Sequence, residues 1–394
     1  MLSVLVLMAS VLALALTWGT PQAGLARLAL AAAVAMGAAA YFTPRVARAA
    51  CRFGIVDRPD GRLKDHTAPV PYLGGLAVGL PFFLSLAILF RFDQRMTGIL
   101  LAGAIALLLG LVDDLGAMSW KAKFAGQALG VLVLVKTGVV ADIASLPPAV
   151  NVLLSVVWLL GLTNALNLID ISDGLAPGVA LFAAGAFVVA ALFDGAALLA
   201  ILAATLFGAL AGFVPHNFAP ARIYLGDAGS MFLGLTLGGI SLAGAYTRVS
   251  AWGLAVPVLI LAVPLFDTAY VVTLRLLHGR NPFLGSPDHL AVRLRRLGWN
   301  ASSIAVGAVA LTVFSSAAGL LLMFLPPSLA PWLVSGVVLV FVVIGVVLAR
   351  VDVTTAVSVS SVAGVNVTDG APDLTTSSRQ DRPDHVPVPA EMRR

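Results

Sequence analysis

The chain has 394 residues, of which 60% are hydrophobic and 11% are charged, and its formal net charge is +5 at pH 7. Soluble domains average about 25% charged residues, and a soluble core grows too slowly with chain length to bury this much apolar surface. The composition therefore predicts a membrane protein, and its charge is too small to indicate a nucleic-acid partner. The single cysteine, Cys51, excludes an intramolecular disulfide.

Apolar runs near the ~20 residues that a membrane-spanning helix needs recur down to about residue 351. They predict an all-α polytopic membrane protein, a bundle of 11–12 transmembrane helices with cytoplasmic catalytic loops. The predicted spans lie near Leu2–Trp18, Gly24–Arg45, Tyr72–Phe90, Thr97–Val112, Phe124–Val140, Val150–Leu168, Leu175–Phe193, Gly195–Val214, Met231–Tyr246, Trp252–Leu276, Ser303–Phe324 and Pro331–Val351.

These runs divide the chain into three parts. Residues 1–23 form an added first helix, which we expect to be retained because no basic segment precedes it. Residues 24–351 form the transmembrane domain. Residues 352–394 are rich in Ser, Thr, Asp and Pro, which predicts a disordered tail.

Lysine and arginine are distributed unevenly between the two sets of connecting loops. Nineteen of the 24 basic residues fall on one side of the predicted bundle or in the tail, and five fall on the other side. Because cytoplasmic loops carry the excess of Lys and Arg, the richer side is predicted to face the cytoplasm.

Aspartates cluster on that same side. Asp113 and Asp114 end an apolar run, and Lys121 and Lys123 follow a short turn. Adjacent carboxylates repel each other unless a cation neutralises them, so a metal ion or a lysine is expected beside them. The alternative is a pair of solvated residues that cap a turn.

A second cluster is spaced at helical intervals. Asn164 and Asn167 lie three residues apart, as do Asp170 and Asp173, and residues at this spacing share one helix face. Polar groups at membrane depth are costly and usually functional. The alternative for Asp173 is a simple turn with Gly174.

The third cluster surrounds Asp227, which lies between Gly226 and Gly229 ahead of an apolar helix. Glycines allow a ligand to approach the backbone closely, and a helix N-terminus favours phosphate. A helix cap without any ligand is the alternative.

Two further charged stretches complete the set. One contains Lys64 and His66, and the other contains Asp267, His289 and Arg293. The spacing of His289 and Arg293 would let a short helix direct both at one anionic ligand, whereas a basic interfacial helix and a structural pairing of Asp267 are the alternatives. Magnesium is commonly held by one or two carboxylates together with substrate phosphates, so the clusters predict phosphoryl or diphosphate chemistry on a bilayer-anchored substrate.

At these residues the sequence resembles the polyprenyl-phosphate N-acetylhexosamine-1-phosphate transferase family, glycosyltransferase family 4. The resemblance covers roughly Gly24 to Leu325 and rests on five motifs in the family's order: Gly54–Gly75, the Asp113-Asp114 pair with Lys123, Asn164–Gly174, Pro220–Ser230 and Pro282–Arg293.

The resemblance implies attack of a polyprenyl (undecaprenyl) phosphate on a UDP-sugar, with UMP as the second product. It also implies a role for each candidate residue. Asp227 and Asn167 would hold Mg²⁺, with Mn²⁺ as the alternative ion, and Lys123 would bind the lipid phosphate. Asp113 or Asp114 would orient or deprotonate that phosphate, and Asp170 and Asp173 would line the donor pocket. Substrate contacts are expected from Lys64, His66, Asn164, His289 and Arg293.

The apolar run before Gly24 is a predicted added helix that the family pattern does not explain. The chain also departs from the family pattern at two places. Ile171 stands where the family usually has the first glycine of an Asp-Gly-x-Asp-Gly motif, and His289 alone remains of a histidine-rich motif. The second departure argues against a pentapeptide-carrying donor. A transporter and an inactive scaffold remain as alternative functions, and helices rich in small residues would permit a homodimer.

Overall fold

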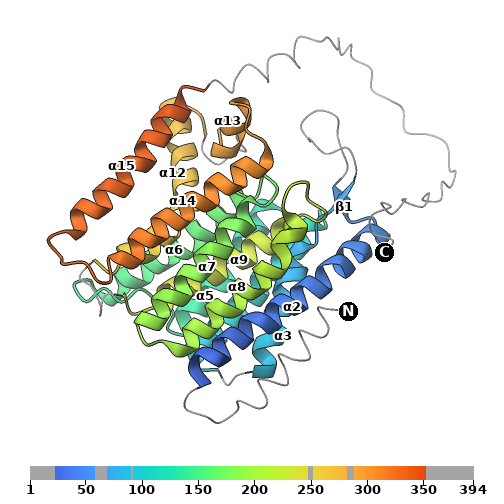
Figure 1. The fold of residues 1–394 in the computed structure, drawn as a ribbon, viewed down its shortest axis with the longest axis horizontal. Coiled ribbons are helices and arrows are strands. Elements are labelled where there is room, and N and C mark those ends of the chain that lie inside the picture. Colours follow the sequence, from blue (N-terminus) through green and yellow to red (C-terminus); the bar gives the residue numbers. More distant parts are fainter. Residues whose placement is uncertain are drawn as a thin grey trace.

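A computed structural model of the protein describes residues 23–57, 69–89, 92–116, 118–246, 252–281 and 288–351. These residues form a helical bundle with one short antiparallel pair of strands, β1 (Val56–Asp57) and β2 (Val70–Pro71) (Figure 1). The helices are α2 (Ala23–Arg52), α3 (Gly74–Leu89), α4 (Gln94–Asp114), α5 (Trp120–Lys136), α6 (Pro148–Leu168), α7 (Leu175–Phe193), α8 (Ala197–Asn217), α9 (Gly226–Ala243), α11 (Ala255–Ile260), α12 (Ala262–Leu277), α13 (Leu290–Arg296), α14 (Ala301–Leu321) and α15 (Ala330–Ala349).

The predicted all-α membrane fold is confirmed. Every predicted span after the first coincides with a helix, and the span near Trp252–Leu276 is divided at Leu261 into α11 and α12. Among the described residues, seven helices are long and apolar enough to cross a membrane. The first predicted helix, Lys64, His66 and the tail 352–394 lie outside the described residues.

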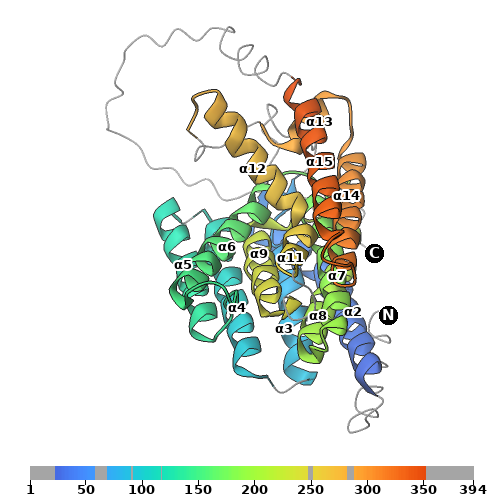
Figure 2. The same cartoon turned by 90° about the vertical axis from the view of Figure 1, so that its left-hand side faces the viewer.

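Short connections make successive helices alternate in direction, so one end of the bundle collects many chain segments. The C-terminal ends of α4, α6 and α8 meet the N-terminal ends of α5, α7 and α9 there. The strand β1 lies at this same end (Figure 1), and the short helix α13 lies there in both views (Figures 1 and 2). The aspartate clusters of the sequence are therefore gathered at one face, as predicted.

Two helices form the centre of the bundle. The helix α8 packs against α2 and α7, and α9 packs against α4 and α6. Nearly the whole length of α9 is buried, from Ala228 to Ser241. A helix that is apolar on all sides and carries several glycines can be enclosed by neighbours at short distance.

Glycines allow the closest of these contacts. A Cβ atom on Gly208 would collide with the backbone of Ala32 in α2, and one on Gly212 would collide with the carbonyl oxygen of Met36. By contrast, a Cβ on Gly161 in α6 would meet no atom within 4 Å. The α2–α8 contact therefore requires glycine, whereas position 161 does not.

We expect Gly208→Ala to destabilise the protein by about 2 kcal/mol, because the added methyl group forces two packed backbones apart. Gly161→Ala should instead be neutral or stabilising, since alanine is favoured over glycine in helices by up to about 1 kcal/mol. Melting temperatures of the two variants in detergent should therefore move in opposite directions. A Gly208→Ala variant as stable as the wild type would contradict the tight α2–α8 contact.

Candidate active site

A lysine and two aspartates from three helix ends form the centre of the site. The Nζ atom of Lys123, in the first turn of α5, lies 2.7 Å from Asp113 Oδ2 at the end of α4. It lies 2.9 Å from Asp227 Oδ2 in the first turn of α9. The ammonium group supplies the neighbouring cation that the sequence predicted for the Asp113-Asp114 pair.

Asn167, near the end of α6, completes this centre. Its Nδ2 donates hydrogen bonds to Asp227 Oδ1 at 2.6 Å and to Ser230 Oγ at 2.9 Å. Its Oδ1 accepts a bond from Lys123 Nζ at 3.5 Å. Three oxygen atoms, from Asp113, Asp227 and Asn167, thus converge on one positive charge. We name these four residues the Lys123 cluster.

Asp114 has a different environment from Asp113. Its Oδ1 accepts a hydrogen bond from the backbone N–H of Asp227 at 2.8 Å, and its Oδ2 accepts one from Ala228 at 3.0 Å. The carboxylate therefore caps the N-terminus of α9, where unpaired N–H groups and the helix dipole favour negative charge. Asp113 faces the lysine, whereas Asp114 holds the helix that carries Asp227.

This cap requires glycine on both sides. Gly226 has a φ angle of 74°, and a Cβ atom on it would lie 2.6 Å from the carbonyl oxygen of Tyr72 and 2.8 Å from Asp114 Oδ2. A Cβ on Gly110 would collide with the backbone of Asp227 and Ala228. In the sequence, the glycines next to Asp227 were the signal for this close approach. Because Gly110 and Gly226 have no side chain, α4 and α9 can bring their carboxylates together.

Asn164 lies next to the Lys123 cluster but points to another helix. Its Nδ2 donates to Gln127 Oε1 at 3.0 Å and to the carbonyl oxygen of Leu160 at 2.8 Å. Gln127 is 3% exposed and was not among the predicted site residues. The structure therefore shows Asn164 joining α6 to α5, one turn from Lys123, and not lining the cavity as a predicted substrate ligand would.

A second missed residue, Asn217, connects the loops around the site. Its Oδ1 accepts a bond from the N–H of Gly174 at 3.0 Å, and its Nδ2 donates to Ile223 O at 2.9 Å. Asp173 Oδ2 also accepts a bond from the N–H of Ala221 at 2.9 Å. In the sequence, the signal for Asn217 was a side-chain amide at the end of an apolar helix, in the run Pro215-His216-Asn217. These bonds fix the α6–α7 loop against the segment that leads into α9.

The residues around the cluster enclose a cavity of about 1060 Å³. This volume is slightly above the usual range for small-molecule sites, about 300–1,000 Å³. Its lining includes the predicted residues Asp113, Asp114, Asn167, Asp170, Asp173 and Asp227, and also Val292, Arg295, Arg296 and Trp299 of the α13–α14 region. The cavity thus brings carboxylates and guanidinium groups together.

Comparisons with known proteins agree with this arrangement. The sequence model of glycosyl transferase family 4 matches residues 96–245, which contain all of the Lys123 cluster. The chain is 35% identical to the probable undecaprenyl-phosphate N-acetylglucosaminyl 1-phosphate transferase of Bacillus subtilis, over 69% of this chain and 78% of that protein.

The chain belongs to glycosyl transferase family 4. It is also 34% identical to the decaprenyl-phosphate N-acetylglucosaminephosphotransferase of Mycobacterium tuberculosis, over 71% of this chain and 78% of that protein. The phospho-N-acetylmuramoyl-pentapeptide-transferase of Moorella thermoacetica is 36% identical over 55% of this chain and 63% of that protein. The predicted family is confirmed, and the protein is a multi-pass membrane protein of this family.

Two predicted substrate ligands of this glycosyl transferase family 4 protein occupy buried positions. His289 Nδ1 lies 2.7 Å from Asp267 Oδ2, and Arg293 Nη2 lies 2.8 Å from Asp288 Oδ1. Neither His289 nor Arg293 lines the cavity, whereas their neighbours Arg295 and Arg296 do. These two arginines were not among the predicted site residues because they follow the motif Pro282–Arg293, on which the resemblance rests.

Asp170, in the loop after α6, is a carboxyl group whose ionisation is disfavoured by its surroundings. Burial raises its pKa from 3.8 to about 8, and the negative charge of Asp227 contributes further. Between pH 4 and 8 the folded protein therefore keeps a proton that the unfolded chain releases. Stability contributed by this proton is complete below about pH 4 and is lost as the pH rises towards 8.

We therefore expect Asp170→Asn to stabilise the protein in the absence of divalent cations, because asparagine cannot ionise. The gain in melting temperature should be small at pH 5 and reach several degrees at pH 8.5. Thermal unfolding of both proteins across this pH range, with a chelator present, measures the difference. A gain that is independent of pH would contradict the raised pKa of Asp170.

Proposed function

We propose that the protein transfers a sugar 1-phosphate, with N-acetylhexosamine 1-phosphate as the expected group, from a UDP-sugar to polyprenyl phosphate. The products are UMP and a lipid-linked diphosphosugar for cell-envelope polysaccharide synthesis. The observation that carries the proposal is the Lys123 cluster, in which a cation and oxygen ligands meet at helix ends beside a cavity large enough for a nucleotide sugar. The names of the similar proteins support the same reaction.

The chemistry is a substitution at phosphorus. An oxygen of the lipid phosphate forms a bond to the phosphorus that carries the sugar, and the bond from that phosphorus to the bridging oxygen of UMP breaks. Positioning and neutralisation of charge supply most of the catalysis in such transfers. Because the second pKa of a phosphate monoester is about 6, the lipid phosphate is largely ionised at neutral pH and needs no strong base.

Lys123 is the residue proposed to bind the lipid phosphate. It lies one residue from Phe124, whose side chain is 52% exposed, and three residues from Trp120, which is 75% exposed. Apolar side chains at a helix start place this turn at the level where a lipid changes from hydrocarbon to headgroup. The lysine would then exchange its contact with Asp113 for one with the phosphate, leaving Asp113 beside the attacking oxygen.

The oxygen atoms of the cluster also suit a magnesium ion. In the described part of the chain, no three acidic, histidine or cysteine side chains form a closed metal cage. Magnesium, however, is typically bound by one or two carboxylates together with substrate phosphates, and oxygens of Asp227 and Asn167 already converge on a cation. We propose that these two residues hold Mg²⁺, with Mn²⁺ as a substitute, which would neutralise the donor's diphosphate.

The site is proposed to face the cytoplasm. The end of the bundle that carries it also carries Arg45, Arg48, Arg275 and the basic helix α13, whereas Lys136 lies at the opposite end. An excess of basic residues marks cytoplasmic loops. A UDP-sugar donor on that side is part of the same proposal.

The arrangement disfavours a transporter. Binding sites of transporters usually lie near the bilayer midplane on broken helices, whereas the Lys123 cluster lies at helix ends. Asp267, which lies further inside its helix, is paired with His289. An inactive scaffold is disfavoured because the cluster keeps a complete set of mutual contacts.

The direct test is UMP release by purified protein supplied with undecaprenyl phosphate, Mg²⁺ and a panel of UDP-sugars. We expect Asp227→Ala to reduce the rate by at least about a thousandfold, as expected when a group that stabilises transition-state charge is removed. Lys136→Ala, at the far end of α5, should change the rate less than twofold. No release from any donor by folded wild-type protein would reject the proposed reaction.

Metal dependence is tested separately. Removal of divalent cations with EDTA should abolish UMP release, because the donor's diphosphate would then be repelled by the carboxylates of the cavity. Added Mg²⁺ should restore the rate fully and Mn²⁺ at least partly. Undiminished release in EDTA would remove the metal from the proposal while leaving the transfer reaction intact.

A further inference from the structure

The short helix α13 has two faces with different surroundings. Val292, Arg295 and Arg296 lie three and four residues apart, a spacing that places them on one side of a helix, and all three line the active-site cavity. Leu290 and Ala291 lie on the other side, in an apolar site between helices. One face is thus turned to the ligand cavity and the other to the bundle.

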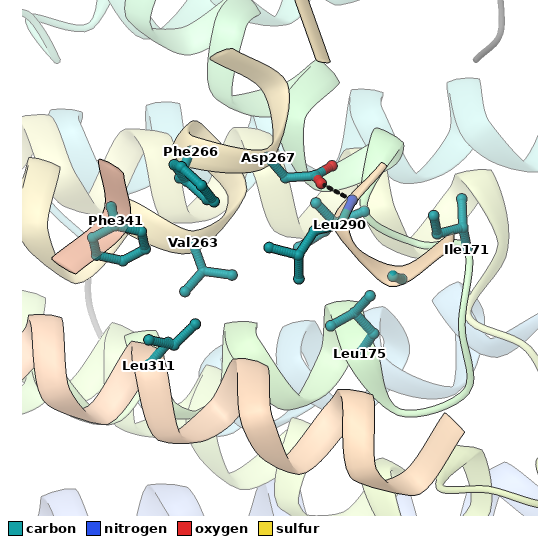
Figure 3. Close-up of a pocket in the computed structure, with 10 residues that line it drawn as sticks. Ile171, Leu175, Val263, Phe266, Asp267, Leu290, Leu311 and Phe341 are labelled. Atoms are coloured by element: carbon teal, nitrogen blue, oxygen red, sulfur yellow. Dashed lines mark hydrogen bonds between the residues drawn. The ribbon is translucent and has the colours of Figure 1, made fainter. Parts of the chain in front are cut away.

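The apolar face fits its site closely. Figure 3 shows Leu290 between Val263, Phe266 and Leu175, with Leu311 and Phe341 nearby. The space left between these side chains is about 10 Å³, which is no larger than a single water molecule requires. This side of α13 therefore anchors the helix and leaves no room for a substrate.

Asp267 of α12 fastens the beginning of α13. Its Oδ1 accepts a hydrogen bond from the backbone N–H of Leu290 at 2.8 Å, drawn as a dashed line in Figure 3. Its Oδ2 pairs with His289 Nδ1 at 2.7 Å, and the side chains of His289 and Asp267 are only 7% and 6% exposed. A buried carboxylate paired in this way is costly to disrupt.

Arg293, in the middle of α13, makes a second set of contacts that hold the helix. Its guanidinium donates through Nη2 to Asp288 Oδ1 at 2.8 Å and through Nη1 to the carbonyl oxygens of Leu348, at 3.0 Å, and Val351, at 2.6 Å. Its Nε donates to the carbonyl oxygen of Asp288 at 3.2 Å. All three nitrogens are engaged within the protein, so Arg293 joins α13 to α15.

Arg295 and Arg296 line the same cavity as the carboxylates. Arg295 Nη2 donates to Ser172 Oγ at 3.3 Å, which places its guanidinium against the loop that carries Asp170 and Asp173. The side chain of Arg296 is exposed. Among the described residues that line the cavity, these two are the basic ones. Guanidinium groups bind phosphate oxygens strongly because their planar donors match the geometry of the anion.

We propose that Arg295 and Arg296 bind the diphosphate of the nucleotide-sugar donor, while His289 and Arg293 act as positioning residues that hold α13 in place. The identity of the donor rests on the proposed function. The proposal assigns the anion contacts to the cavity face of α13 and not to the residues that match the family's motif. It also predicts that binding of the acceptor, whose phosphate is proposed to contact Lys123, does not depend on these arginines.

The test measures equilibrium binding of UDP to detergent-solubilised full-length protein by calorimetry, without lipid acceptor. Arg295→Gln and Arg296→Gln should each weaken UDP binding about tenfold, since each removes charge-assisted hydrogen bonds. Arg280→Gln is the matched control, because Arg280 is exposed at the end of α12 and does not line the cavity. It should bind UDP as the wild type does.

Steady-state kinetics distinguish effects on the donor from effects on the lipid acceptor. In the UMP-release assay, Arg295→Gln and Arg296→Gln should raise the KM for the donor about tenfold, with the KM for undecaprenyl phosphate within twofold of the wild-type value. A rise in the acceptor KM alone would assign the arginines to the lipid phosphate and overturn the proposal. Unchanged donor affinity in both variants of an active protein would overturn it as well.

His289→Gln tests the positioning role. Glutamine can keep one hydrogen bond to Asp267, so the variant should fold but melt at a lower temperature, with a smaller rise in donor KM than Arg296→Gln. An unchanged melting temperature with a tenfold rise in donor KM would show that His289 is itself a ligand and overturn the assignment. If UDP binding depends on the arginines but no donor releases UMP, the proposed reaction fails and this inference stands.

Discussion

The ammonium group of Lys123, held between oxygens of Asp113, Asp227 and Asn167, is the interaction on which the site depends. Ionised groups at the edge of a bilayer are costly unless they are paired, and each of these groups supplies the partner of another. The contacts join α4, α5, α6 and α9 at one point. Any ligand that displaces the lysine from these carboxylates must therefore supply positive charge in its place. A divalent cation that binds together with a phosphate meets this requirement.

Close backbone packing makes this pairing geometrically accessible. Gly110 lets α4 touch the first turn of α9, and Gly226 lets the chain turn with a positive φ angle just before Asp227. Asp114 then caps the same turn through two backbone N–H groups. The two adjacent aspartates consequently do different work. Asp113 faces Lys123, and Asp114 fixes the position of the residue proposed to hold the metal.

The part of the cavity that α13 forms is held in place by different interactions. The helix α13 has only seven residues, too few to be stable alone. It is fixed by two buried pairs, His289–Asp267 and Arg293–Asp288, and by an apolar face. Its remaining face is basic. A cavity lined by both carboxylates and arginines can hold a diphosphate together with a cation, which connects the fold to the proposed reaction.

Composition and hydrophobic runs were sufficient to predict the membrane fold, and the clustering of Asp113, Asp114, Asn167 and Asp227 at one face was predicted from helix ends alone. Both follow from local rules: apolar runs must lie in lipid, and successive helices alternate in direction. The sequence could not separate Asp113 from Asp114, or show that Asn164 pairs with Gln127, because these choices depend on the rotation and packing of helices distant in sequence. Nor could it show that His289 and Arg293 point into the protein while Arg295 and Arg296 face the cavity. Only the tertiary structure decides which side of a short helix is buried, because the partners, Asp267, Leu348 and Val351, come from other helices or helix ends.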